Sequence, residues 1–169
     1  MELKLKSISK GGVAEAISKA ELYRFLNEPG EADSICHDVL AVEPENQMAL
    51  RLLGLAITDR FTGGGSDRFE EAEAIFARLR DPYERLYYTG LLHERRAKAQ
   101  LKAGHRPHTV TVLFEEAMRC FEEAEKIRPA GNDDAILRWN RCVRILQSRD
   151  ASDWQSELES FEASDSPPV

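Results

Sequence analysis

Residues 117–129, AMRCFEEAEKIRP, carry the pattern from which the architecture of this chain follows. Ala117, Phe121 and Ala124 are spaced by four and three residues, so they fall on one face of a helix. The proline at position 129 marks where that helix stops. The same spacing recurs in the first half of the chain, at Ala32, Cys36, Val39 and Pro44. Such recurrence is typical of stacked helical hairpins, since no single hairpin buries its apolar face alone.

The composition is that of one helical domain of 169 residues. No apolar stretch approaches the roughly 20 residues that cross a bilayer, and the N-terminus lacks the apolar core of a secretion signal. The three cysteines are far apart and lie in apolar helical patterns, which indicates buried thiols in a reducing compartment. We therefore expect a cytoplasmic protein without membrane association.

Charge is distributed unevenly along the chain. The net charge of −7 argues against binding of duplex nucleic acid, because that affinity comes largely from cationic side chains. Residues 82–107 are nevertheless basic, with six Lys and Arg against two Glu. After Arg149 there is no Lys or Arg, and six acidic residues follow. A basic middle and an acidic end are suited either to internal pairing or to a partner.

Prolines, glycines and capping residues predict where helices begin and end. We read Pro29-Gly30 as a turn, 62–66 as a flexible loop with Ser66 capping the next helix, and Asp81-Pro82 as a helix start. The expected helices span residues 13–27, 31–42, 46–60, 67–79, 82–103, a segment after Thr109 to 127, 132–147, and a short one around Trp154 to Phe161. We expect a flexible arm at 1–12, a helical domain at 13–162 and a disordered tail at 163–169.

These patterns resemble the tetratricopeptide repeat family, whose helix–turn–helix units repeat about every 34 residues. The second-helix pattern of that family is matched at residues 117–129, and its first-helix pattern at Leu50, Leu53, Gly54 and Ile57. The resemblance implies an all-α, right-handed stack of about three to four helical hairpins, an α-solenoid closed by a short C-terminal helix. Gly54, with Ala20 and Gly90 as its equivalents, is expected to allow close approach of paired helices.

The spacing within the units departs from that of the family. Ala20 and Ala32 are 12 residues apart, as the family requires, whereas Gly54 and Ala72 are 18 apart. Gly90 and Ala117 are 27 apart, so the middle units have longer helices or expanded loops. Another solenoid of helical hairpins is the alternative architecture.

The resemblance implies a scaffold that binds a peptide or helix of another protein, with no catalytic role and no cofactor. In this family the first helix of each hairpin lines a concave groove. Matching positions here are Arg24, Phe25, Arg51, Leu55, Tyr87, Leu91, Arg95, Asn140 and Arg144. Arginines mixed with apolar side chains suit a segment with apolar anchors and some acidic residues. The partner's identity and the oligomeric state stay open, as does whether the acidic end caps the stack or occupies the groove.

Two other classes of function compete with a protein scaffold. A metal-dependent hydrolase would use His93, Glu94, His105 and His108, although these residues lack the helical HExxH spacing of a zinc protease. A helical-repeat protein that binds single-stranded RNA would use Arg95, Arg96 and nearby aromatic side chains. Neither pattern extends beyond a few residues, so we expect neither enzymatic activity nor nucleic-acid binding.

Overall fold

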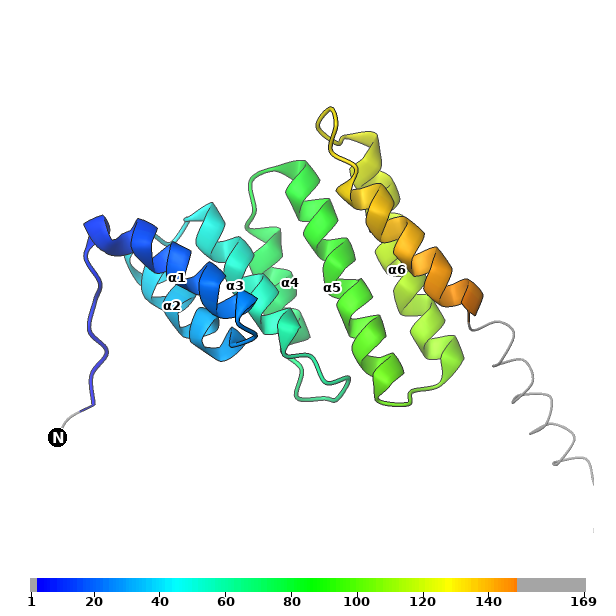
Figure 1. Cartoon of the computed structure of the whole chain (residues 1–169), viewed down its shortest axis with the longest axis horizontal. Coiled ribbons are helices and arrows are strands. Elements are labelled where there is room, and N and C mark those ends of the chain that lie inside the picture. The colour runs from blue at the N-terminus through cyan, green and yellow to red at the C-terminus, as the bar shows by residue number, and fades with distance from the viewer. Residues whose placement is uncertain (1–2, 149–169) are drawn as a thin grey trace, which may run out of the picture.

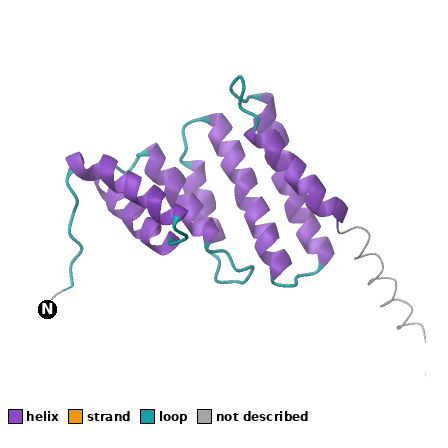
Figure 2. Ribbon diagram, in the orientation of Figure 1, coloured by secondary structure: helices purple, strands orange, loops and turns teal. Residues whose placement is uncertain are grey.

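The structure, a computed structural model, describes residues 3–148, and over this range it is helical without strands. Figure 1 shows the helices side by side along one axis, and Figure 2 shows the short loops that join them. After a 3-10 turn, Lys10–Gly12, come α1 (Val13–Phe25), α2 (Pro29–Val42), α3 (Gln47–Asp59), α4 (Phe69–Ala77), α5 (Pro82–Lys102), α6 (Pro107–Lys126) and a last described helix, 134–148.

Three prolines start helices in this fold. Pro82 begins α5 as predicted, and the side chain of Asp81 caps it by accepting a hydrogen bond from the Tyr83 amide at 2.8 Å. Pro29 was read as a turn residue, and the helix that Pro107 begins was expected to start only after Thr109. Both predictions were wrong, because each proline lies in the first turn of its helix. Proline lacks an amide hydrogen that the first turn would leave unpaired anyway, so it fits there.

Each helix packs against the next along the chain, from α1 to α6. Contacts also join α1 to α3 and α3 to α5, so these three helices form one layer. The helix 134–148 extends this order of packing by one helix. Its buried Ala135 and Cys142 belong to the same apolar cluster as Phe114 and Phe121 of α6.

The paired helices approach most closely where a glycine faces an aromatic ring. A Cβ atom added to Gly54 of α3 would lie 2.3 Å from the ring of Phe76 on α4. In the next pair, a Cβ atom on Gly90 of α5 would lie 2.7 Å from the ring of Phe121 on α6. Both rings are essentially inaccessible to solvent. The predicted close approach at these two glycines is therefore confirmed.

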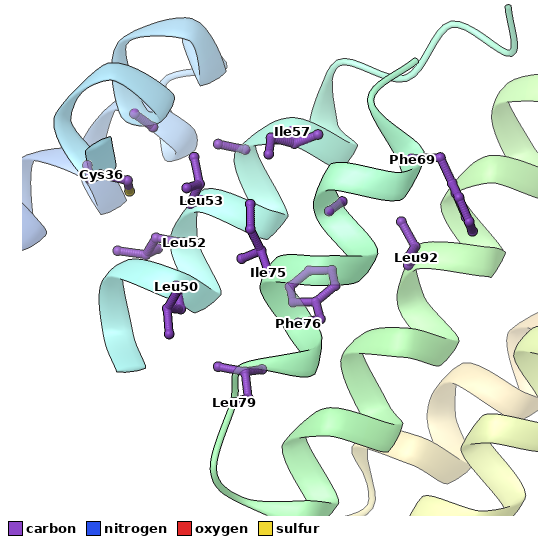
Figure 3. Packing of buried hydrophobic residues seen from close by; sticks show 14 residues of the cluster. Cys36, Leu50, Leu52, Leu53, Ile57, Phe69, Ile75, Phe76, Leu79 and Leu92 are labelled. Atoms are coloured by element: carbon purple, nitrogen blue, oxygen red, sulfur yellow. The ribbon is translucent and has the colours of Figure 1, made fainter. Parts of the chain in front are cut away.

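The apolar core is formed largely by the residues that the sequence pattern singled out. One cluster joins α1 to α5 and includes Ala20, Ala32, Cys36, Leu53 and Phe76, and Figure 3 shows part of it around α3 and α4. The other large cluster joins α5, α6 and the helix 134–148. Burial raises the pKa of the Cys36 and Cys142 thiols to about 12, which keeps them protonated and unreactive.

The loop before α4 was predicted to be flexible, but it is held by hydrogen bonds. The Asp67 carboxylate accepts from the Thr62 amide at 2.8 Å and from the Gly63 amide at 2.8 Å. Gly63 has φ +86° and leaves no room for a side chain, because a Cβ atom would lie 2.6 Å from the Ala99 carbonyl oxygen. Ser66 does not cap α4, whose N-cap is Arg68. The predicted Trp154 helix and the 163–169 tail lie outside the described residues.

Replacing Gly54 with alanine tests the close approach directly. Gly54→Ala is expected to lower the free energy of unfolding by about 1–3 kcal/mol, because the buried Phe76 ring must shift to admit a methyl group. Chemical denaturation of the full chain measures this effect. Gly30→Ala is the matched control, since a Cβ atom there meets nothing within 4 Å, and it is expected to be neutral or slightly stabilising. Equal effects of the two changes would contradict the packing described here.

Candidate protein-binding groove

A cleft of about 580 Å³ opens on the layer formed by α1, α3 and α5. Four residues predicted for a binding groove line it together: Arg24, Phe25, Arg51 and Leu55. Its other lining residues are Glu21, Leu52 and Tyr88. The sequence therefore identified much of this cleft, which we call the α1–α3 cleft.

Apolar side chains are exposed around the end of α1, and one of them, Phe25, lines this cleft. Phe25 is 88 % exposed, and its neighbours Leu22 and Leu26 are 52 % and 53 % exposed. An exposed phenylalanine contributes little to folding, because most of its apolar surface stays in water. Grouped exposure of this kind is a feature of surfaces that bind other molecules.

A single carboxylate joins the three helices of this layer. Asp59, the last residue of α3, accepts a hydrogen bond from Arg24 Nε of α1 at 2.7 Å. Its other oxygen, Oδ1, accepts from Arg95 Nη1 of α5 at 2.5 Å. A carboxylate is disfavoured at the C-terminus of a helix by the helix dipole, and the two cations offset that cost.

Arg95 is held more tightly than a surface arginine. Its Nη1 also donates to the Thr58 hydroxyl at 2.6 Å and to the Leu55 carbonyl at 3.1 Å. Burial lowers the pKa of Arg95, while Asp59 raises it. The Arg95 guanidinium is therefore engaged mainly by groups of α3. A binding partner could contact only the guanidinium atoms that remain exposed.

Arg51 is also paired within the protein. Its Nη1 donates to Glu84 Oε1 of α5 at 2.8 Å. Burial raises the pKa of the nearby Tyr88 phenol, and Arg51 lowers it through its charge and a hydrogen bond. The arginines of the α1–α3 cleft are thus largely neutralised by Asp59 and Glu84.

A second cleft, of about 410 Å³, lies between α3, α5 and the helix 134–148. Its lining is rich in cations, and we call it the basic cleft: Arg95, Lys98, Lys102 and Arg138, with Thr58, Asp59, Phe61 and Ala99. Glu94 of α5 is fully buried beneath it. Glu94 Oε1 pairs with Lys98 Nζ one turn along α5 and lies 3.5 Å from Arg138 Nη1.

The remaining residues predicted for the groove lie elsewhere. Leu91 is only 3 % exposed and is therefore a core residue. Tyr87 packs between rings, with its centroid 5.9 Å from that of Tyr83 and 6.0 Å from that of Phe121. Asn140 and Arg144 are not among the residues that line either of the two clefts.

Three cations of the basic cleft were missed: Lys98, Lys102 and Arg138. For Arg138 the missing signal was the inward face of the helix 134–148, which is set by buried Ala135 and Cys142. Arg138 is three residues after Ala135 and four before Cys142, so it lies along that face. Asn140 points away from it.

The structure places the residues of the two alternative sites in different surroundings. Within residues 3–148, no three or more His, Cys, Asp or Glu side chains are grouped so that they could hold a metal ion. His105 and His108 are exposed, while Glu94 is buried with Lys98. For single-stranded RNA, Arg95 binds Asp59 whereas Arg96 lies over the Phe69 ring, 4.2 Å from its centroid.

His93 is a packed side chain whose ring centroid lies 5.4 Å from that of Phe69. Its Nδ1 lies 3.3 Å from Glu116 Oε2 but forms no hydrogen bond within the described part of the chain. Burial lowers the pKa of His93 below its usual range, Glu116 and Glu73 raise it in part, and Arg96 lowers it. The imidazole is therefore packed in its neutral form.

Comparisons with known proteins identify no relative from which a function could be inferred, so the function is argued from the geometry described above. No protein-family model matches the chain, and neither a curated protein nor a solved structure shows significant similarity to it. Over residues 3–148, none of the helices combines the length and the apolar character that crossing a membrane demands.

Removing the charge of Asp59 is expected to loosen the contacts among α1, α3 and α5. Asp59→Asn should lower the free energy of unfolding by about 1–3 kcal/mol, because two partly buried arginines lose a charged hydrogen-bond acceptor. Thermal or denaturant unfolding measures the change. Glu125→Gln, at an exposed carboxylate near the end of α6, should change stability by less than about 0.5 kcal/mol. An Asp59→Asn protein as stable as the wild type would show that the bridge is dispensable.

The pH dependence of stability should report His93. A histidine whose pKa is lowered in the folded state binds fewer protons there than in the unfolded chain, so stability falls as the pH drops through the usual histidine range, near about 6.5. We expect part of this loss to disappear in His93→Leu. Denaturation of both proteins at several pH values between about 7.5 and 5.5 tests it. Identical slopes in the two proteins would contradict a buried neutral imidazole.

Proposed function

We propose that this chain is a helical-repeat protein of the tetratricopeptide type that binds a peptide or helical segment of another protein. The segment would lie along the layer formed by α1, α3 and α5. The observation that carries the proposal is the α1–α3 cleft, where Phe25 stands 88 % exposed beside Arg24, Arg51 and Leu55.

The order of helix contacts supports a stack of hairpins. The pairs α1/α2, α3/α4 and α5/α6 are the three units, and α1/α3 and α3/α5 contacts join the first helices. The small residues Ala20, Gly54 and Gly90 recur at equivalent places in these first helices, and all three are buried. A curved stack brings the helices of its inner layer closer together, so α1, α3 and α5 would form the concave side.

The charges of the cleft favour a partner bound first through apolar anchors. Arg24 and Arg51 already have carboxylate partners within the chain, so each offers an acidic ligand only part of its charge. Apolar side chains of a bound segment would cover Phe25 and Leu55, which gain most from leaving water. Acidic residues of the same segment would then lie within reach of the arginines at the rim.

A binding role accounts for these features without catalysis or a cofactor. We further propose a cytoplasmic location, because Cys36, Cys120 and Cys142 are all free thiols. Free thiols persist in reducing compartments, whereas secreted proteins of this size commonly form disulfides.

Truncating the exposed phenylalanine tests the proposed surface. Partners captured by the full chain from cells of its source would be identified by mass spectrometry and their affinities measured with purified proteins. Phe25→Ala is expected to weaken binding of the principal partner by about 1–4 kcal/mol, roughly fivefold to a thousandfold, if Phe25 anchors it. Stability should be unchanged because the side chain is exposed.

Leu137→Ala is the matched control, since Leu137 is 63 % exposed and lies outside both clefts. It should leave the affinity within about twofold of the wild-type value. Equal affinities of the wild type and the Phe25→Ala protein would place the interface on another surface.

A further inference from the structure

The basic cleft is a local excess of positive charge on an acidic chain. Four cations line it, against Asp59 in its wall and Glu94 beneath it. The whole chain carries a net charge of −7. Cations at such close spacing repel one another, so the cleft would be stabilised by additional negative charge.

The carboxylates near the cleft do not neutralise these four cations equally. Lys98 and Arg138 share one oxygen of Glu94, Oε1, while the other oxygen is buried without a hydrogen bond among residues 3–148. Lys102 is exposed and forms no ion pair within the described range. Lys102 and the exposed parts of Lys98 and Arg138 therefore present positive charge to the cleft that the carboxylates of residues 3–148 neutralise only in part.

The chain itself carries the complementary charge in the residues that follow. Beyond Arg149 there are six carboxylates, Asp150, Asp153, Glu157, Glu159, Glu162 and Asp165, and no Lys or Arg. These six carboxylates account for six of the seven units of the chain's net negative charge. The same segment contains the apolar side chains of Trp154, Leu158 and Phe161.

We propose that the acidic segment 150–165 binds the basic cleft of the same chain. Its carboxylates pair with Lys98, Lys102 and Arg138, and its apolar side chains contact Phe61 and Ala99 in the cleft wall. This inference goes beyond the proposed function, which concerns the α1–α3 cleft.

The geometry permits this contact within one molecule. Arg138 and the end of the helix at residue 148 are ten residues apart, or about 15 Å along the helix axis. A few residues of extended chain cover that distance, at about 3.3 Å each. Tethering at this range gives an effective concentration in the millimolar range, so even weak ion pairs would be populated.

Zero-length cross-linking of the full chain tests the proposal. A carbodiimide joins a lysine amine to a carboxylate that touches it, and mass spectrometry identifies the linked peptides. Equal amounts of unlabelled and ¹⁵N-labelled protein are mixed first, so that links within one molecule carry a single isotope. We expect Lys98 and Lys102 to be joined to carboxylates of 150–165 at least about ten times as often as the exposed Lys19.

Salt and matched variants make the test specific. The links should be largely lost at about 1 M salt, where charges are screened beyond about 3 Å. Arg138→Gln should reduce them several-fold, whereas Arg141→Gln, an exposed arginine on the same helix, should not. Circular dichroism of both variants confirms that they stay folded.

Three results would overturn the proposal: links spread evenly over the lysines, links between unlike isotopes, or equal yields in the two arginine variants. None of these bears on Phe25, which lines the other cleft, so binding of an external partner through the α1–α3 cleft would stand or fall on its own experiment.

Discussion

The contact of Gly54 with Phe76, repeated by Gly90 with Phe121, is the constraint on which the rest of this structure depends. A glycine in the first helix of a pair lets a buried ring from the second helix lie against its backbone. The contact fixes both the separation and the rotation of the two helices, because any side chain at the glycine would strike the ring. Once α3 and α5 are rotated so that Gly54 and Gly90 face their partners, other side chains of the two helices line the two clefts.

Ion pairs then join different helices through carboxylates that each lie close to at least two cations. Asp59 binds Arg24 and Arg95 on the layer of α1, α3 and α5, and Glu94 pairs with Lys98 and lies near Arg138 of the last described helix. On α2, Asp33 binds Arg68 and lies 3.6 Å from Arg60. A buried charge is costly unless paired, so these groups hold specific helix arrangements more than they add stability. These carboxylates also pair with arginines that would otherwise be free to bind an acidic ligand.

The sequence predicted the helices, the small residues at their contacts and four residues of the α1–α3 cleft, because local spacing determines each of these. It did not distinguish Pro29 and Pro107 as helix starts, since a proline fits a turn or a first helical turn equally well and packing decides between them. Leu91, Asn140 and Arg144 were placed by the spacing of a repeat family, whereas the rotation of each helix is set by its own buried residues. Glu94 was considered only as part of a metal site, and its burial beside Arg138, distant in the sequence, was not predicted.

The central claim is that the layer of α1, α3 and α5 is a surface for binding a protein segment. Hydrogen–deuterium exchange of the full chain, alone and saturated with a captured partner, tests this most directly. We expect slower exchange in α1 and α3 around Phe25, Arg51 and Leu55, with α2, α4 and α6 little changed. Protection confined to α2, α4 or α6 would contradict it.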